Sequence, residues 1–218
     1  YAWAVAPEGF ADDTKLAYGH VFVLLAAARA RQVGHPDADR LLGDVAGVLD
    51  LRFWDKGAGL LSDEYRRDWT PFSTYRGMNA NMHGAEAMLA AHEATGERQW
   101  LDRAGRILEF FAGRIAPEHG WRLPEHYSTS WEPRLDYNRD EPAHPFRPYG
   151  ATVGHGLEWA RLLLTLATVG VLAERFVRGR LLEQAIERAG LEYTFLRDNF
   201  YLDVFPDFVS ADRVLRGA

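Results

Sequence analysis

The chain has 218 residues, of which 47% are hydrophobic and 26% charged, and its formal net charge is −6. This length and composition suit one globular domain, residues 1–218, with a substantial core. Basic residues form no cluster, which argues against a nucleic acid partner, and the absence of cysteine excludes disulfides and thiolate chemistry.

The longest apolar run without a charge, residues 162–173, is too short to cross a bilayer and is better explained as a buried helix. We find no secretory or transit signal in the sequence. We therefore expect a cytoplasmic protein with no membrane partner, which agrees with the lack of cysteine.

Apolar residues recur at helical spacing in six stretches, which predict three helix hairpins. The stretches are 14–33, 37–54, 81–94, 98–111, a segment that begins at Gly154, and 174–190. Asp12 and Asp13 precede the first helix and suit an N-terminal cap. Strand signals are confined to 57–65 and 119–128, where we expect at most short β-hairpins in the long loops.

The hairpins form an internal repeat. Placing His20 on His83 and then on His155 gives steps of 63 and 72 residues. Repeated helix hairpins build either an open solenoid or a closed α/α toroid. The extra length lies in aromatic loops, 52–77 and 121–138, which are either walls of a ligand site or plugs over helix ends. We predict an all-α fold, a toroid of about six hairpins, of which this chain covers roughly half.

Two of the histidines share a local motif. "NMHGAE" and "GHGLEW" place a histidine three residues before a glutamate, on one face of a first helical turn. Free N–H groups and the helix dipole disfavour an imidazolium there, whereas the carboxylate orients the ring or raises its pKa again. One such motif alone is most simply a helix cap with a surface ion pair. Two copies in matching repeat positions favour an acid–base site.

Other kinds of site have less support. The two histidines and their glutamates are common metal ligands, but neither segment has the histidine pair at i,i+4 of a helical zinc site, so we predict no metal. No G-x-S-x-G motif of a serine hydrolase occurs. A glycosidase with paired carboxylates stays open, with Glu158, Glu125 or Asp136 as candidates.

Three segments resemble the N-acylglucosamine 2-epimerase superfamily: "DDTKLAYGHVFVLLAAA" (12–28), "YRGMNANMHGAEAMLAAHEATGERQWLDRA" (75–104) and "FRPYGATVGHGLEWARLLL" (146–164). Within it, residues 123–150 are more similar to the mannose isomerase branch than to the acylglucosamine or cellobiose epimerases. The resemblance covers residues 1–165, whereas 165–218 do not align. It implies an (α/α)6 barrel, a cytoplasmic enzyme acting at C1 and C2 of a sugar, and no cofactor or metal.

The resemblance also implies roles for individual residues. Its catalytic residues correspond to His155, Glu158 and His83, and its substrate-binding residues to Asn79, Tyr18 and Arg147. Glu125 and His126 lie on a loop that approaches the same cavity, and we do not count them as catalytic. A second catalytic histidine comes from the last third of the family's chain, and no histidine follows His155 here.

The implied reaction converts an aldose such as D-mannose to its ketose, D-fructose, through a cis-enediol. The alternatives are a sugar 2-epimerase of the acylglucosamine or cellobiose type, and a non-catalytic fragment that binds a sugar or a protein. The expected partner is a monosaccharide, with association of copies through exposed barrel faces as a further expectation. We expect His155 and Glu158 to line the cavity, without the facing carboxylate pair of a glycosidase.

Overall fold

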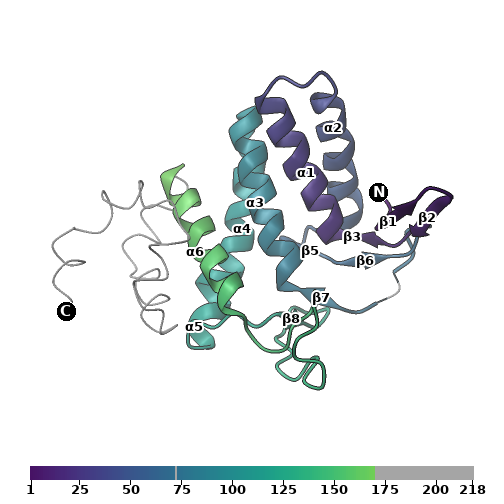
Figure 1. Cartoon of the computed structure of the whole chain (residues 1–218). Coiled ribbons are helices and arrows are strands. Elements are labelled where there is room, and N and C mark those ends of the chain that lie inside the picture. Colours follow the sequence, from purple (N-terminus) through teal and green to yellow (C-terminus); the bar gives the residue numbers. More distant parts are fainter. Residues whose placement is uncertain (72, 170–218) are drawn as a thin grey trace.

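The computed structural model of the chain describes residues 1–71 and 73–169. Its helices are α1 (Ala17–Gln32), α2 (Ala38–Val48), α3 (Met78–Thr95), α4 (Arg98–Leu108), α5 (Ala116–Glu118) and α6 (Val153–Thr168). The π-helical segments Leu49–Phe53 and Glu109–Ile115 continue α2 and α4. Two hairpins, α1–α2 and α3–α4, stand side by side, and α6 packs along α3 and α4 (Figure 1).

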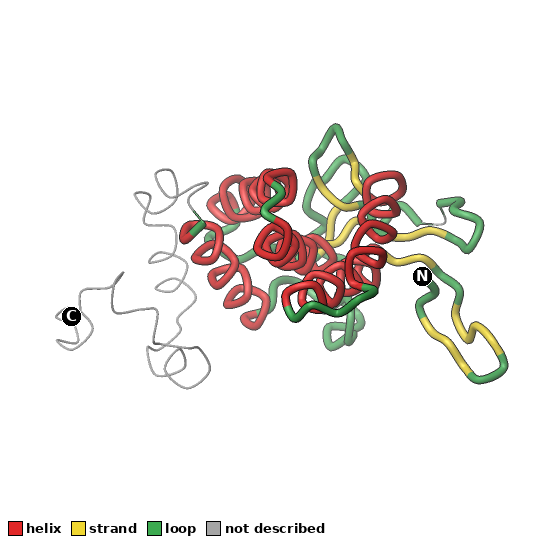
Figure 2. The backbone as a smooth tube through the Cα atoms, turned by 90° about the horizontal axis from the view of Figure 1, so that it is seen from above, coloured by secondary structure: helices red, strands yellow, loops and turns green. Residues whose placement is uncertain are grey.

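The described strands are short and form antiparallel pairs. The pairs are β1 (Ala4–Ala6) with β2 (Gly9–Asp12), β3 (Lys15–Leu16) with β6 (Glu64–Tyr65), β4 (Trp54–Asp55) with β5 (Leu60–Leu61), and β7 (Arg76–Gly77) with β8 (His126–Tyr127). Strands β3 and β7 lead directly into α1 and α3. The β3–β6 and β7–β8 pairs therefore lie at the N-terminal ends of these two helices (Figure 1). The β1–β2 hairpin projects away from the helices (Figure 2).

Helix α3 is the centre of the described core. It packs against α1, α4 and α6, and small or apolar residues on all its sides allow this burial. Gly84 lets the side chain of Leu61 pack directly against the backbone of α3, because a Cβ at this position would lie 2.5 Å from Cδ1 of Leu61. The helix ends at Gly96, which has φ 74° and donates its N–H to the carbonyl of His92 at 2.7 Å.

The predicted helices that lie within the described residues are confirmed, with differences at their ends. The proposed cap at Asp12 and Asp13 is wrong: Asp12 accepts a hydrogen bond from Thr14 N at 2.9 Å, and α1 begins only at Ala17. The ladder between β3 and β6 holds the intervening residues extended. The strand signals coincide with β5, β6 and β8, whereas the β1–β2 hairpin was not predicted. The predicted helix 174–190 lies outside the described residues.

The structure corrects the register of the internal repeat. His20, His83 and His155 are the fourth, sixth and third residues of their helices, so the three histidines are not equivalent. The counterpart of His20 is Asn81, because each donates a side-chain hydrogen bond to the carbonyl four residues earlier, at 2.7 and 2.9 Å respectively. Aligning His20 with His83, instead of with Asn81, displaced the predicted repeat by two residues.

Within the described part of the chain, no helix combines the length and apolar character needed to cross a membrane.

Candidate active site

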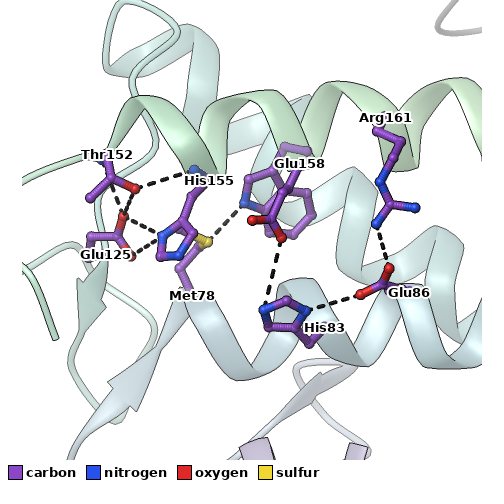
Figure 3. Close-up of polar contacts among 9 residues, drawn as sticks. Met78, His83, Glu86, Glu125, Thr152, His155, Glu158 and Arg161 are labelled. Carbon is purple, nitrogen blue, oxygen red and sulfur yellow. Dashed lines mark hydrogen bonds and ion pairs between the residues drawn. The ribbon is translucent and has the colours of Figure 1, made fainter. Parts of the chain in front are cut away.

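The three predicted catalytic side chains meet between α3 and α6. His155 and Glu158 point from α6 toward α3, and His83 points from α3 toward α6 (Figure 3). Nε2 of His83 lies 3.9 Å from a carboxylate oxygen of Glu158, and its Nδ1 lies 3.1 Å from Glu86. The two helices therefore bring together two imidazoles and two carboxylates, which is a set of groups suited to moving protons.

The pairing of these groups differs in part from the motif. His83 contacts Glu86 in its own helix, as the spacing predicts. Nδ1 of His155, in contrast, lies 2.8 and 2.9 Å from the two carboxylate oxygens of Glu125, and Glu158 turns toward His83 (Figure 3). Glu125 lies on the loop before β8, 30 residues away in the chain, so spacing within one helix gave no indication of this contact.

Helix-end electrostatics apply to only one of the two histidines. His155 lies in the first turn of α6, where its N–H donates to Oγ1 of Thr152 at 3.3 Å. His83 lies in the second turn of α3, not in the first as predicted. Burial by itself lowers the pKa of His155, but the hydrogen bond and charge of Glu125, aided by Glu158, outweigh it and raise that pKa above the ordinary 6.5. The protonated form of His155 is therefore stabilised.

A cavity of about 280 Å³ lies at the N-terminal ends of α1 and α3. The three predicted substrate-binding residues, Tyr18, Asn79 and Arg147, all line it. The ring of Tyr18 also meets the ring of His83 edge-on, with centroids 5.5 Å apart, so this tyrosine connects the cavity to the group of side chains between α3 and α6. Aromatic walls of this kind stack on the apolar faces of ligands.

Asn79 and Arg147 differ in whether their polar groups already have partners within the protein. Oδ1 of Asn79 is buried and has no hydrogen-bond partner in residues 1–71 and 73–169, which leaves it able to accept a hydrogen bond from a ligand hydroxyl. Arg147 is already held: its guanidinium lies 4.1 Å from the ring centroid of Tyr75 and forms a close ion pair with Glu64. Asn79 is therefore the ready acceptor, and Arg147 a fixed positive charge.

His155 and Glu158 do not line this cavity, contrary to the expectation from the sequence. Their side chains are 20% and 37% exposed, because this face of α6 is open between α3 and solvent. The cavity does contain two carboxyls, Asp63 and Glu64. Both are engaged, Asp63 with the N–H of Gly77 at 2.6 Å and Glu64 with Arg147.

Glu86 connects α3 to α6, which leads to a prediction on stability. It accepts hydrogen bonds from His83 at 3.1 Å and Arg161 at 2.5 Å, and these, against the cost of burial, lower its pKa from 4.5 to about 2. A carboxyl whose pKa is depressed by folding contributes stability above its unfolded pKa and loses it as the pH falls through the folded pKa. Glu86→Gln should therefore lower the free energy of unfolding by about 1–2 kcal/mol near neutral pH, with a shrinking difference below about pH 4.5.

Urea denaturation of both proteins across that pH range measures this difference. The control is Glu93→Gln, because Glu93 and its partner Arg29 are 62% and 55% exposed and such surface pairs contribute about 0–1 kcal/mol. A difference between wild type and Glu86→Gln that stays constant down to acid pH would contradict the assigned role.

Glu125 is the residue whose contact the sequence does not predict. The sequence places it on a loop near the cavity without a catalytic role, whereas the structure brings it into direct contact with His155. Its neighbour His126 is a structural residue: Nε2 donates to the carbonyl of Pro148 at 2.7 Å, so Nδ1 accepts from the hydroxyl of Tyr75 at 3.0 Å. Across residues 1–71 and 73–169, no three His, Asp or Glu side chains are grouped to hold a metal ion.

The fold and the site together define a class of protein, stacked helix hairpins in which α3 and α6 bring histidines and carboxylates together beside a cavity with aromatic walls. The family model described as N-acylglucosamine 2-epimerase (GlcNAc 2-epimerase) matches residues 1–198. The chain belongs to this family.

Individual relatives agree with this assignment. A D-mannose isomerase of Thermobifida fusca is 52% identical over 154 residues, which are 71% of this chain and 38% of that protein. A crystal structure of D-mannose isomerase matches with a TM-score of 0.79 and 34% identity, covering 86% of this chain and 47% of that one. The cellobiose 2-epimerase of Bacillus thermoamylovorans B4167 matches in fold alone, with a TM-score of 0.68 and 16% identity over 89% of this chain and 48% of that one.

The chain spans less than half the length of each of these relatives. Its mostly helical structure therefore corresponds to about half of the (α/α)6 toroid that they share, as the sequence predicted.

Proposed function

We propose that this protein interconverts an aldose such as D-mannose with its ketose, D-fructose, by acid–base proton transfer. The observation that carries the proposal is the meeting of His83, His155 and Glu158 between two helices, next to a cavity with an unpaired amide oxygen. The similarity to D-mannose isomerases, at 52% identity, supports mannose as the sugar.

In the proposed reaction the sugar is bound in its open-chain form, with C1 as an aldehyde and C2 carrying a hydroxyl. His155 removes the proton from C2, the electrons of the C2–H bond form the C1–C2 double bond, and the oxygen on C1 receives a proton, which gives a cis-enediol. The proton then returns from His155 to C1, and the C2 hydroxyl gives up its proton as C2 becomes a carbonyl. No electrons leave the sugar, so histidines and carboxylates alone suffice for the chemistry.

The remaining residues bind the sugar and stabilise charge. Asn79 accepts a hydrogen bond from a sugar hydroxyl through its unpaired oxygen, and Tyr18 stacks against the carbon skeleton. Arg147 places a positive charge at the cavity, where it offsets negative charge that develops on the sugar oxygens. His83 and Glu158, 3.9 Å apart, exchange the hydroxyl protons.

Proton NMR of the protein with D-mannose in D2O, with EDTA present, tests the proposal. Fructose with deuterium at C1 is the expected product, because the abstracted proton exchanges with solvent before it returns. Glucose as the first product would instead establish a 2-epimerase, in which the proton returns to C2 from the other face. No turnover of any aldose would contradict both activities and leave a sugar-binding role.

A further inference from the structure

Asp63 and Glu125 occupy equivalent places in the two described repeats. The backbone carbonyl of Asp63 accepts a hydrogen bond from Ala17 N at 2.8 Å, and that of Glu125 from Met78 N at 2.9 Å. Ala17 and Met78 are the first residues of α1 and α3. Each acidic residue is followed at once by a strand that pairs with the strand leading into the same helix.

The two carboxylates also reach forward in the same way. Asp63 accepts from the N–H of Gly77, which caps α3, at 2.6 Å. Glu125 accepts from the N–H and the hydroxyl of Thr152, which caps α6, at 3.2 and 3.1 Å. Each acidic residue therefore holds the start of one helix through its backbone carbonyl and the start of the next hairpin's first helix through its side chain. This structural role explains why an acidic residue stands at both positions.

Glu125 has one contact that this shared role does not explain. Both of its oxygens lie within 2.9 Å of Nδ1 of His155, and the residue is only 2% exposed. The third residue of α3, which corresponds to His155 by its place in the helix, is Ala80, so the equivalent site in the earlier repeat has no imidazole. The contact between Glu125 and His155 is an addition to the repeat, confined to the place where the catalytic group forms.

We propose that Glu125 is the positioning residue of His155, fixing the proton on Nδ1 so that Nε2 is the nitrogen that exchanges a proton with the sugar. The assignment of Nε2 to the sugar rests on the proposed function; the fixed tautomer does not. An ionised carboxylate only accepts hydrogen bonds, so the nitrogen that faces it carries the proton and Nε2 keeps its lone pair. When Nε2 takes the C2 proton, the buried negative charge of Glu125 stabilises the imidazolium.

The charged and titratable groups around His155 are few among the described residues. Glu125 contacts it from the loop before β8, Glu158 lies one turn further along α6, and His83 faces Glu158 from α3. In the part of the chain that the structure describes, the carboxylate of Glu125 alone is within hydrogen-bond distance of the His155 ring. A change confined to Glu125 should therefore alter His155 more than any other change nearby.

The test is a histidine NMR titration of the ¹⁵N-labelled protein, with His155→Ala used to assign the signals of His155. Neutral His155 should be protonated on Nδ1, and its pKa should lie above 6.5. Glu125→Gln preserves size and hydrogen bonding but removes the charge, so the pKa of His155 should fall by about 1–3. In the same variant the acid limb of kcat/KM should move to lower pH, and kcat should fall.

Two further variants separate positioning from structural support. Glu132→Gln removes an exposed carboxylate from the loop that follows β8 and should leave the pKa of His155 unchanged. Thr152→Ala removes the hydroxyl that donates to Glu125 but keeps the backbone N–H contact and the charge of Glu125, so tautomer and pKa should both persist. If Glu125→Gln does not fold, the tautomer of neutral His155 in the wild-type protein is the measurement that tests the proposal.

Protonation of neutral His155 on Nε2 in the wild type, or an unchanged pKa in a folded Glu125→Gln variant, would overturn the proposal. The titration requires no turnover. A failure of the isomerase assay therefore leaves the positioning of His155 testable, and a failure of the titration leaves the isomerase activity to be judged by its own assay.

Discussion

Asn81→Ala is expected to destabilise the protein by about 2–5 kcal/mol, because it leaves several buried backbone groups without partners. Asn81 is fully buried. Its side-chain oxygen accepts from Leu61 N at 2.8 Å, and its amide nitrogen donates to the carbonyls of Leu61 and Gly77 at 3.1 and 2.9 Å. Alanine removes all three bonds, and the interior offers Leu61 no water in exchange. Urea denaturation measures the loss.

Asn79→Ala is the matched control, since the same change is made two residues earlier in the same helix. The buried oxygen of Asn79 has no partner among the described residues, so its removal should change the free energy of unfolding by well under 1 kcal/mol. The same variant should weaken sugar binding. Equal losses of stability in the two variants would show that Asn81 has no special part in holding the loop to α3.

The helices could be predicted from the sequence because helical periodicity is a local property. Their ends could not, since tertiary hydrogen bonds determine them. The first helix begins at Ala17, whose N–H donates to the carbonyl of Asp63, and no pattern near Asp12 reveals that partner. Asn81 is a similar case: the sequence shows an asparagine near the start of a helix, but only the fold shows that its side chain bonds the backbone N–H and carbonyl of Leu61.

In the candidate site, too, the contacts within one helix could be predicted from the sequence, whereas those between distant segments could not. The pair of His83 and Glu86 was evident from its spacing of three residues, and the structure has it. The contact of His155 with Glu125 joins residues 30 apart, and the sequence instead suggested Glu158. The match of Glu125 with Asp63 comes from their hydrogen bonds to the first residues of α3 and α1. No single step along the sequence gives both this match and that of His20 with Asn81, and the counterpart of His20 is not a histidine.

His155→Ala is expected to lower kcat/KM for the isomerisation of D-mannose by about 100- to 10,000-fold, the usual contribution of a general base. The imidazole is the group assigned to remove the C2 proton, and its partner Glu125 is too deeply buried to replace it, at 2% exposure. Exchange of the C2 proton with D2O should fall by the same factor as fructose formation. Proton NMR follows both in one experiment.

The control is His35→Ala, which removes an exposed histidine from the turn between α1 and α2 and should leave turnover unchanged. Sugar binding separates catalysis from loss of the pocket, because Tyr18 and Asn79, which line the cavity, are unchanged in His155→Ala. Saturation-transfer NMR should therefore show D-mannose bound to His155→Ala about as well as to the wild type. If His155→Ala still exchanges the C2 proton within about tenfold of the wild-type rate, the base is a different residue. His83, which lies 3.9 Å from Glu158 on the facing helix, would then be the next residue to replace.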